Sequence, residues 1–522
     1  MMHARFTGWA LLCLLLSVGS AVADSRLADA IKDGDHQAAL AMLKAGVDVN
    51  GAQPDGATAL HWAVYRDDVE LVKALLARGA HPNVVNALGS TPLAEAVKVS
   101  NLELVALLLK AHADVESANG DGETALMLAA RNGSLPIAKL LVSHGANVNA
   151  RERWRGQTAL MWAAAERNAE GVELLLAHGA QLNVHAFSTD WGNQITSEPR
   201  AQYRPTGGLT PLLYAARSGC QRCVAAMLKA GADINQPNPD GITPLMTAID
   251  NLHFDLAKEL LARGANPHTW DWWGRTPLYV AVDMHSYPNS RVAFNGPRVH
   301  VDITDQTSAL DIVKLLLAAG VNPNPQLDMH RPGRGGNSAR FVENLLTTGA
   351  TPLLRAALAQ DAEACQVLLE HGALVDLPNV MGVTPLMAAA GIGFSTNDPR
   401  PLFEGDMQGR ALATLEVLVR AGADVNARIT DTSSHTARIA RPSTVTDRQG
   451  QTAIYGPIIW SWTRVAQFLI AHGAKVDVTD AMGRTPLNTL TDDIARRDQK
   501  AAEEMTALIR SASAAPQGAP HT

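Results

Sequence analysis

The chain has 522 residues, of which 47% are hydrophobic, and its formal net charge at pH 7 is −7. This weakly acidic balance argues against general binding of nucleic acid, because proteins that bind nucleic acid usually carry a basic face. Four cysteines in a chain of this length are too few for disulfide bonds to hold the fold together.

The first 23 residues have the features of a secretory signal peptide. Arg5 gives a short positive start, residues 9–18 form an apolar run, and Ala21-Val22-Ala23 is typical of a cleavage site. The apolar run is too short to span a bilayer, which needs about 20 residues. We therefore expect residues 1–23 to be removed, leaving a periplasmic or secreted protein with no membrane span. A retained N-terminal anchor is the alternative.

A short motif recurs along the rest of the chain, most often at a step of 33 residues. It reads Gly-x-Thr-Pro-Leu or Gly-x-Thr-Ala-Leu, with Ile replacing Leu in one copy. Its glycines are Gly56, Gly89, Gly122, Gly156, Gly208, Gly241, Gly274, Gly349, Gly382, Gly450 and Gly483. A period of this length predicts one supersecondary unit stacked on copies of itself, with a core that exists only between neighbours.

The copy that begins at Gly241 shows what each recurring position of the motif does. The glycine allows a turn at positive φ, Thr243 caps a helix, and Pro244 fits the first helical position. Leucines at helical spacing predict a second helix over residues 254–263. Gly264 then ends that helix, so the predicted unit is turn, helix, helix and hairpin loop.

This pattern resembles the ankyrin repeat: residues 55–63 match its opening and residues 71–80 its second helix. The resemblance implies an all-α fold, an ankyrin-repeat α-solenoid of about eleven helix-turn-helix repeats over residues 24–510, with a flexible tail over 511–522. The layout is also similar to that of exported bacterial ankyrin proteins. Two positions depart from the pattern. His112 replaces a helix-ending glycine, and Pro457 should kink or shorten a first helix.

Longer steps between motifs locate five insertions. They lie near residues 186–207, 284–308, 325–347, 391–409 and 427–448. Three emerge at hairpin tips and two at the opposite end, where paired helices turn, so the stacked core should stay intact. Their composition is typical of loops, and the last carries four arginines. Solvated loops, a pocket for an acidic partner and low-complexity disorder all fit this composition.

Cys220 and Cys223 form a Cys-x-x-Cys pair. No histidine follows it, so it is not a haem-attachment motif, and no second pair is present to complete a zinc site. We interpret the pair as structural, reduced or bridged, in preference to a redox catalyst. Cys365 aligns with a buried valine position and is expected in the core.

The resemblance implies that partners bind at the hairpin tips and along the first helices, where Trp and Arg are favoured anchors. At these positions the chain has Tyr65, Arg66, Trp154, Arg155, Trp270, Trp272, Trp273, Arg275 and Trp460. Three tryptophans at one tip, Trp270, Trp272 and Trp273, cannot all be buried in an ordinary repeat. They form either a binding hot spot or a surface that the neighbouring insertion covers.

The sequence has no glycine-rich phosphate loop after a strand, no Gly-x-Ser-x-Gly and no His-Glu-x-x-His. We therefore expect no catalytic residues, no cofactor and no metal. The preferred function is a monomeric, exported, non-catalytic scaffold that binds an unidentified protein partner and no nucleic acid. Two alternatives remain: a specific inhibitor or immunity-type protein for one periplasmic enzyme, and an enzyme whose site is built from the insertions.

Overall fold

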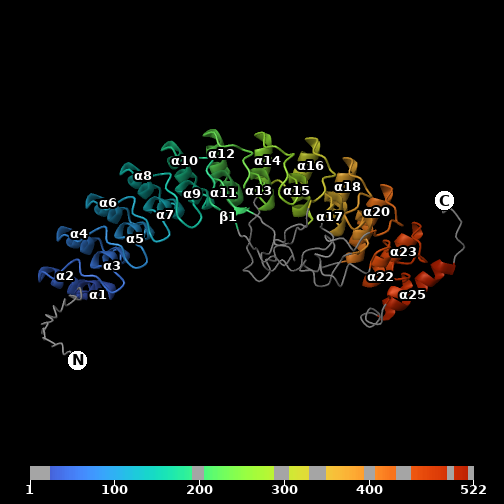
Figure 1. The fold of residues 1–522 in the computed structure, drawn as a ribbon, viewed down its shortest axis with the longest axis horizontal. Helices are drawn as coiled ribbons and strands as arrows, with labels where there is room; N and C mark the ends of the chain where they lie inside the picture. Colours follow the sequence, from blue (N-terminus) through green and yellow to red (C-terminus); the bar gives the residue numbers. More distant parts are fainter. Residues whose placement is uncertain are drawn as a thin grey trace, which may run out of the picture. The chain divides into compact units, whose positions relative to one another are not determined.

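A computed structural model describes residues 24–190, 205–286, 305–328, 348–392, 406–430, 448–490 and 499–514 (Figure 1). The predicted signal peptide and most of each predicted insertion lie outside these ranges. The chain divides between Glu152 and Arg153 into two compact units. We call residues 24–152 unit 1 and the described residues from 153 onwards unit 2.

Unit 1 is built from consecutive helix pairs. Its helices are α1 (Arg26–Lys32), α2 (His36–Lys44), α3 (Ala59–Tyr65), α4 (Val69–Ala77), α5 (Pro92–Lys98), α6 (Leu102–Lys110), α7 (Ala125–Asn132) and α8 (Leu135–Ser143). The first helix of each pair contacts the first helix of the next pair, and the second helices stack in the same way. The stack therefore has two helical layers.

Unit 2 has the same architecture within itself, with its first helices in one layer and its second helices in the other (Figure 1). Its helices are α9 (Ala159–Ala165), α10 (Ala169–Ala177), α11 (Pro211–Ser218), α12 (Gln221–Lys229), α13 (Pro244–Asp250), α14 (Phe254–Ala262), α15 (Pro277–His285), α16 (Ala309–Ala318), α17 (Pro352–Leu358), α18 (Ala362–Glu370), α19 (Pro385–Ala389), α20 (Met407–Arg420), α22 (Tyr455–Trp460), α23 (Thr463–Ala471), the 3-10 helix η3 (Leu487–Thr489) and α25 (Gln499–Ala514). The prediction of an all-α repeat solenoid is confirmed.

The local signals of the motif act as expected in the copy that begins at Gly241. This glycine has φ of 80°, and the Thr243 hydroxyl accepts a hydrogen bond from the backbone N–H of Met246 at 3.3 Å. Pro244 is the first residue of α13. Gly264, with φ of 91°, follows the end of α14. In this copy, the start of the first helix and the end of the second helix are therefore set by short-range chemistry, before any packing is considered.

The two departures from the motif have different consequences. His112 adopts the positive φ, 64°, that glycine has in the other copies, so this helix ends normally. In the other copy, α22 begins at Tyr455 and has six residues, against seven in α13. The proline at position 457 lies in its first turn, where no helical hydrogen bond from its nitrogen is needed.

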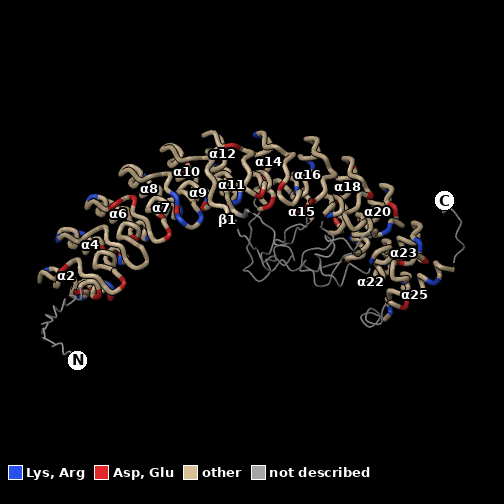
Figure 2. Tube along the Cα trace, in the orientation of Figure 1, with Lys and Arg blue, Asp and Glu red and all other residues tan. Residues whose placement is uncertain are grey.

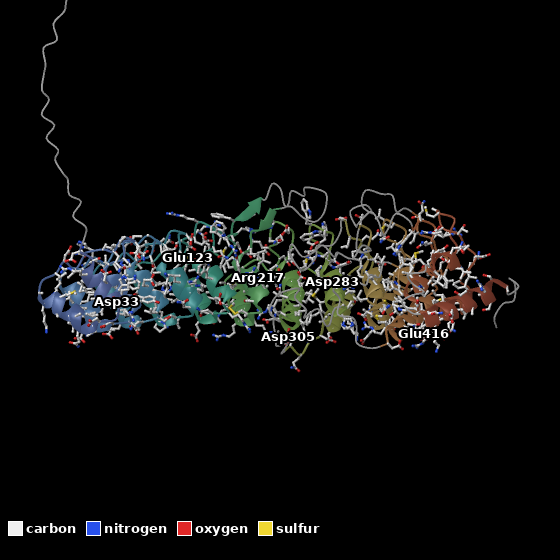
Figure 3. The ribbon with its side chains drawn as sticks, turned by 90° about the horizontal axis from the view of Figure 1, so that it is seen from below. Asp33, Glu123, Arg217, Asp283, Asp305 and Glu416 are labelled. Atoms are coloured by element: carbon white, nitrogen blue, oxygen red, sulfur yellow. A yellow bond between two sulfur atoms is a disulfide. The ribbon has the colours of Figure 1, made fainter. Side chains whose placement is uncertain are left out.

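Described residues that flank two of the predicted insertions lie at opposite edges of unit 2. After α10, strands β1 (Ser188–Asp190) and β2 (Pro205–Gly207) pair in antiparallel register and start an insertion at a hairpin tip. Figure 3 shows this strand pair at one edge of unit 2 and Asp305, which precedes α16, at the other. We call these the tip edge and the turn edge. The repeat pattern gave no signal for the strand pair.

Apolar side chains between neighbouring copies form the core. Leu245 on α13 and Leu260 on α14 are fully buried, and Cys365 on α18 is buried as predicted. At the C-terminal end, α25 covers α23 and buries Met505 and Ile509. This helix runs to Ala514, past the predicted end of the solenoid at residue 510. Within the described residues, no helix combines the length and hydropathy needed to cross a membrane.

Candidate functional site

The hairpin tips of unit 2 are joined to one another by backbone hydrogen bonds. The N–H of Phe187 donates to the carbonyl oxygen of Arg155 at 2.6 Å, and the N–H of Trp272 donates to that of Asp240 at 2.8 Å. In the next pair of tips, the N–H of Asp328 donates to the carbonyl oxygen of Trp273 at 3.0 Å. Because each of these tips is fixed to its neighbour, side chains on them are held at defined positions.

Large aromatic side chains on these tips face solvent. Trp154 is 78% exposed, Phe187 50%, Trp270 68% and Trp272 42%. We call these four residues the aromatic tip row. Scattered exposed apolar residues are ordinary on a protein surface, but aromatic residues that share one edge mark a candidate binding surface. Trp154, Trp270 and Trp272 were among the sequence-predicted residues, whereas Phe187 was missed because it lies at the start of an insertion.

Asp271 determines which tryptophans are exposed in the hairpin tip that contains Trp270, Trp272 and Trp273. Its Oδ1 accepts hydrogen bonds from the backbone N–H groups of Trp273 and Arg275, at 3.0 and 2.9 Å. Its Oδ2 accepts from Nε of Arg275 at 2.7 Å. This turn directs Trp272 outward and Trp273 inward, where Trp273 is only 4% exposed and stacks on the Arg275 guanidinium at 5.3 Å. The sequence offered two interpretations of these three tryptophans, a binding hot spot or a covered surface. Neither describes all three, because Trp270 and Trp272 are exposed and Trp273 is buried.

The charges in this tip are buried together. Burial raises the pKa of Asp271 against the opposing effect of Arg275. Burial also disfavours the charged Arg275 guanidinium, but Asp250 and Asp271 outweigh that cost and raise the pKa of Arg275. The arginine therefore stays charged and holds the tip in shape. Since it is buried, it is positioned to support Trp273 rather than to meet a partner directly.

The other sequence-predicted residues lie elsewhere. Arg155 is exposed on the tip of Trp154, where Figure 2 shows basic residues on the loop before α9. Trp460, at the end of α22, is half-buried and donates its indole N–H to the carbonyl oxygen of Gly391 at 3.1 Å. Tyr65 and Arg66 are exposed at the end of α3 in unit 1, where Arg66 donates to the carbonyl oxygen of Lys32. The nine predicted residues are therefore not one cluster.

A serine, a histidine and an aspartate meet at the turn edge, but not in a catalytic arrangement. The hydroxyl of Ser286 donates to Oδ2 of Asp361 at 2.8 Å. Nε2 of His285 lies 3.6 Å from the same oxygen. A histidine base would have to lie between the serine and the carboxylate, whereas here both contact the carboxylate. Asp361 also caps α18 by accepting from the N–H of Ala364 at 3.0 Å, which is a structural role.

The Cys220–Cys223 pair is bridged by a disulfide at the start of α12. The sequence left open whether this pair is reduced or bridged, and in the structure it is bridged. No group of three or more His, Cys, Asp and Glu side chains in the described part of the chain is arranged to hold a metal ion.

Comparisons with known proteins give one consistent family. A family model described as ankyrin repeats (3 copies) matches residues 27–119, 100–186, 212–293 and 299–396. Human mitochondrial disaggregase is 34% identical over 187 residues, which are 35% of this chain and 24% of that protein. The probable E3 ubiquitin-protein ligase XBOS32 of Oryza sativa subsp. japonica is 28% identical over 178 residues, 34% of this chain and 33% of that protein.

Human neurogenic locus notch homolog protein 1 is 29% identical over 202 residues, 36% of this chain and 8% of that protein. The chain therefore spans about a third or less of the length of these three relatives. Two of these relatives, the disaggregase and the ubiquitin-protein ligase, are named for an activity of the whole protein. They share only the matched segment with this chain.

Proposed function

The chain belongs to the ankyrin repeat family, and we propose that it is an exported, non-catalytic scaffold that binds a partner protein through the aromatic tip row of unit 2. Ankyrin repeats generally mediate protein–protein interaction, and the family is generally non-catalytic. The proposal adds a compartment, a binding face and a set of anchoring residues to that general property.

One observation carries the proposed face: Trp154, Phe187, Trp270 and Trp272 are exposed on hairpin tips of the same unit. Aromatic anchors contribute most of the binding energy in interfaces when they become desolvated. The backbone bonds between these tips fix the anchors before binding, so that little conformational freedom is lost when a partner docks.

The charges around the row suggest the chemistry of the partner. Arg153 and Arg155 are exposed on either side of Trp154 in sequence. Arginine pairs well with carboxylates and stacks on aromatic faces. We therefore expect a partner surface that combines acidic side chains with apolar ones.

Export rests on the first 23 residues, with their positive start, apolar run and Ala21-Val22-Ala23. Sequencing of the N-terminus of the protein recovered from a periplasmic fraction should begin at Asp24. Recovery of the chain in the cytoplasm with Met1 retained would remove the compartment from the proposal.

The test of the face compares two kinds of tryptophan in one tip. The immobilised mature chain is used to capture proteins from a periplasmic extract, and the dominant captured protein is purified. Its affinity is then measured by calorimetry for the wild type and for the double variant Trp270→Ala with Trp272→Ala. We expect the double variant to lose at least about 2 kcal/mol of binding free energy, roughly a 30-fold rise in Kd. Its melting temperature should stay close to that of the wild type.

Trp273→Ala is the matched control, because Trp273 belongs to the same tip but is buried. It should lower the melting temperature and change affinity much less at a temperature where the variant is folded. If the double variant binds as tightly as the wild type, the aromatic tip row is not the binding face.

A further inference from the structure

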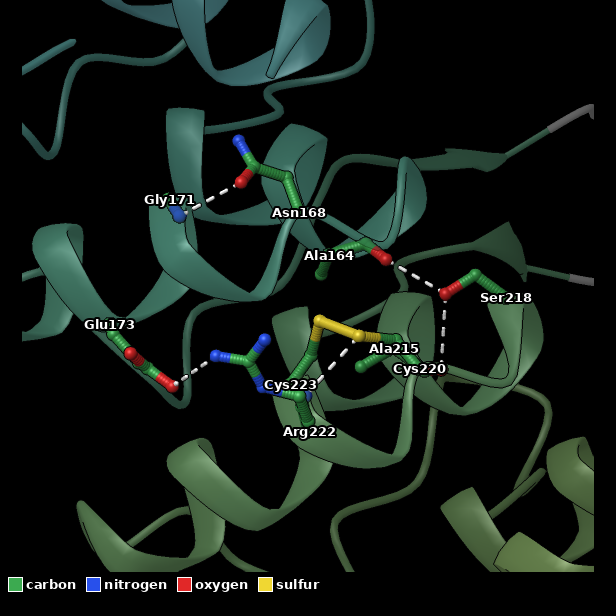
Figure 4. Close-up of a disulfide and its surroundings, with 9 residues drawn as sticks. All are labelled: Ala164, Asn168, Gly171, Glu173, Ala215, Ser218, Cys220, Arg222 and Cys223. Atoms are coloured by element: carbon green, nitrogen blue, oxygen red, sulfur yellow. Dashed lines mark hydrogen bonds and ion pairs between the residues drawn. A yellow bond between two sulfur atoms is a disulfide. The ribbon is translucent and has the colours of Figure 1, made fainter. Parts of the chain in front are cut away.

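The turn edge of unit 2 has a cleft of about 400 Å³ between two neighbouring copies. Residues 167–170, at the start of α10, line one side, and residues 219–222, at the start of α12, line the other. The Cys220–Cys223 disulfide belongs to the second side (Figure 4). The cleft is therefore a surface opening with a sulfur–sulfur bond in its wall, at the opposite edge from the aromatic tip row.

Cys220 occupies a position that other copies use for a capping oxygen. The side chains of Asp35, Asp68, Asn101, Asn168, Asp361 and Asp406 accept a backbone N–H at the start of their second helices. In this copy, Sγ of Cys220 accepts from the N–H of Cys223 at 3.2 Å. Sulfur is a weaker acceptor than oxygen, so helix capping alone does not account for a cysteine here.

Cross-linking contributes little to the stability of the fold at this site. A disulfide stabilises mainly by restricting the unfolded chain, and its effect falls as the closed loop becomes shorter. The two cysteines are three residues apart at the first turn of one helix. The bridge does not join two copies, so the stack does not depend on it.

The electrostatic setting favours a thiolate once the bond is opened. Both sulfurs lie at the N-terminus of α12, a nine-residue helix, where the helix dipole stabilises negative charge. The cleft also contains the cationic side chains of Arg167 and Arg222. Glu170 lines the cleft as well, and Glu173 lies 3.4 Å from Arg222, so the carboxylates offset part of this effect.

The two sulfurs differ in access, because Cys220 lines the cleft and is 5% exposed while Cys223 is fully buried. We propose that this disulfide is a thiol-exchange site at which a cysteine of a partner protein attaches reversibly to Cys220. The partner thiolate attacks Sγ of Cys220, and the Cys220–Cys223 bond breaks as the mixed disulfide forms. The electron pair leaves on Sγ of Cys223, which then takes a proton from water.

A second thiol on the same partner ends the attachment in the forward direction. It attacks the partner's own sulfur in the mixed disulfide and releases Cys220 as a thiolate. The partner is then oxidised to a disulfide and the Cys220–Cys223 pair is reduced, so that two electrons have moved to this chain. The inference does not rest on the proposed binding face, since the cleft and the aromatic tip row lie at different edges.

The first experiment uses the folded mature chain and dithiothreitol as the probe. Free thiols are alkylated at intervals and located by mass spectrometry, in native buffer and in denaturant. We expect the native pair to be reduced within about tenfold of the rate in denaturant, with circular dichroism unchanged. Reduction that is more than about a hundredfold slower in native buffer, or a protein isolated with both thiols free, would overturn the proposal.

The second experiment separates the two sulfurs with oxidised glutathione as the probe. Cys223→Ser leaves Cys220 at the cleft, and Cys220→Ser leaves only the buried Cys223. We expect Cys220 to form the mixed disulfide at least about ten times faster than Cys223 in the matched variant. Cys365, buried in α18 with a thiol pKa that burial raises, should not react and serves as an internal control. Equal rates at Cys220 and Cys223 would show that the cleft gives no selective access, which would overturn the site.

Discussion

Unit 1 and unit 2 are built from the same repeat but differ in their connections, their buried charges and their exposed tip residues. In unit 1, helices α1 to α8 follow one another with short connections, and their buried residues are apolar apart from His61. Unit 2 interrupts the same helix pairs with insertions, buries Asp283 and Arg355 inside first helices and exposes aromatic residues on its tips. The exposed tip residues of unit 1 include the aliphatic Val85 and Leu88.

The comparison shows which positions the stack constrains. Thr91 in unit 1 and Thr243 in unit 2 cap their helices with the same hydrogen bond, and both units pack first helix on first helix. Tips and turns are free to differ because no core lies beneath them. A binding function is therefore expected where the copies differ, and most of those differences lie in unit 2.

The largest effect is expected at the ion pair inside unit 2. Nε of Arg355 donates to Oδ1 of Asp283 at 2.5 Å, and both side chains are buried. Asp283→Ala should destabilise the protein by about 3–5 kcal/mol, because it leaves a buried guanidinium without this carboxylate. The double change Asp283→Leu with Arg355→Met should recover most of the loss, since neither charge of this pair then remains to be buried. Urea unfolding followed by circular dichroism measures both.

The matched control is an exposed ion pair in unit 1. Nζ of Lys73 lies 2.6 Å from Oε1 of Glu103, and more than half of each side chain is exposed. Glu103→Ala should cost less than about 1 kcal/mol. If Asp283→Ala cost no more than Glu103→Ala, the pair in unit 2 would be solvated and this contrast between the units would disappear.

An intermediate effect is expected in unit 1, where His61 is buried in the cap of α3. Its Nδ1 lies 3.2 Å from the N–H of Thr58, and its Nε2 lies 3.2 Å from the carbonyl oxygen of Ser90. The neutral ring satisfies both contacts, and burial lowers the pKa of His61. Its contribution to stability is therefore complete above the unfolded pKa of about 6.5 and is lost as pH falls through the lower folded value.

His61→Ala should therefore cost about 1–3 kcal/mol at pH 8 and less at pH 5. His36 provides the opposite sign, because its contact with Asp68 at 2.6 Å raises the pKa of His36. That contribution is present below the unfolded pKa and is lost as pH rises, so His36→Ala should cost more at pH 5 than at pH 8. Unfolding curves at the two pH values check both. Costs that changed in the same direction for the two variants would contradict the assignment.

The fold was predictable because its signals are local. Gly241, Thr243 and Pro244 specify a turn and a helix start within five residues, and this pattern recurs along the chain. Strands β1 and β2 were not predicted, since their pairing joins the two ends of an insertion, where the repeat pattern gives no signal. The extension of α25 to Ala514 was also not predicted, because residues 511–514 carry no repeat signal, and the buried residues Met505 and Ile509 of this helix lie before residue 510.

The candidate site was predictable only in part. The sequence identified the tip that contains three tryptophans, but the burial of Trp273 and Arg275 depends on how the Asp271 carboxylate folds that tip. Such a bond depends on three-dimensional geometry that spacing along the chain does not encode. Phe187 had no periodic signal, and its backbone bond to Arg155 joins it to the tip that carries Trp154.

The smallest effect is expected from shortening the insertion near 427–448. Residues 431–447 lie outside the described part of the chain, but the residues that flank them are already joined. The N–H of Ile429 donates to the carbonyl oxygen of Gln451 at 3.0 Å, and the N–H of Gly450 donates to that of Ile429 at 2.8 Å. A short tip can therefore close this hairpin, and the cost of loop closure varies only weakly with loop length.

Replacing residues 431–447 by a short tip should thus change the free energy of unfolding by less than about 1 kcal/mol, because the flanking residues already close the hairpin. Leu245→Ala is the contrast, since Leu245 is fully buried on α13, which packs between α11 and α15. It should cost about 2–5 kcal/mol. Thermal unfolding of both variants decides the matter. A shortened protein that unfolds while Leu245→Ala stays stable would mean that the tip edge carries part of the core, and that packing between copies does not alone hold unit 2 together.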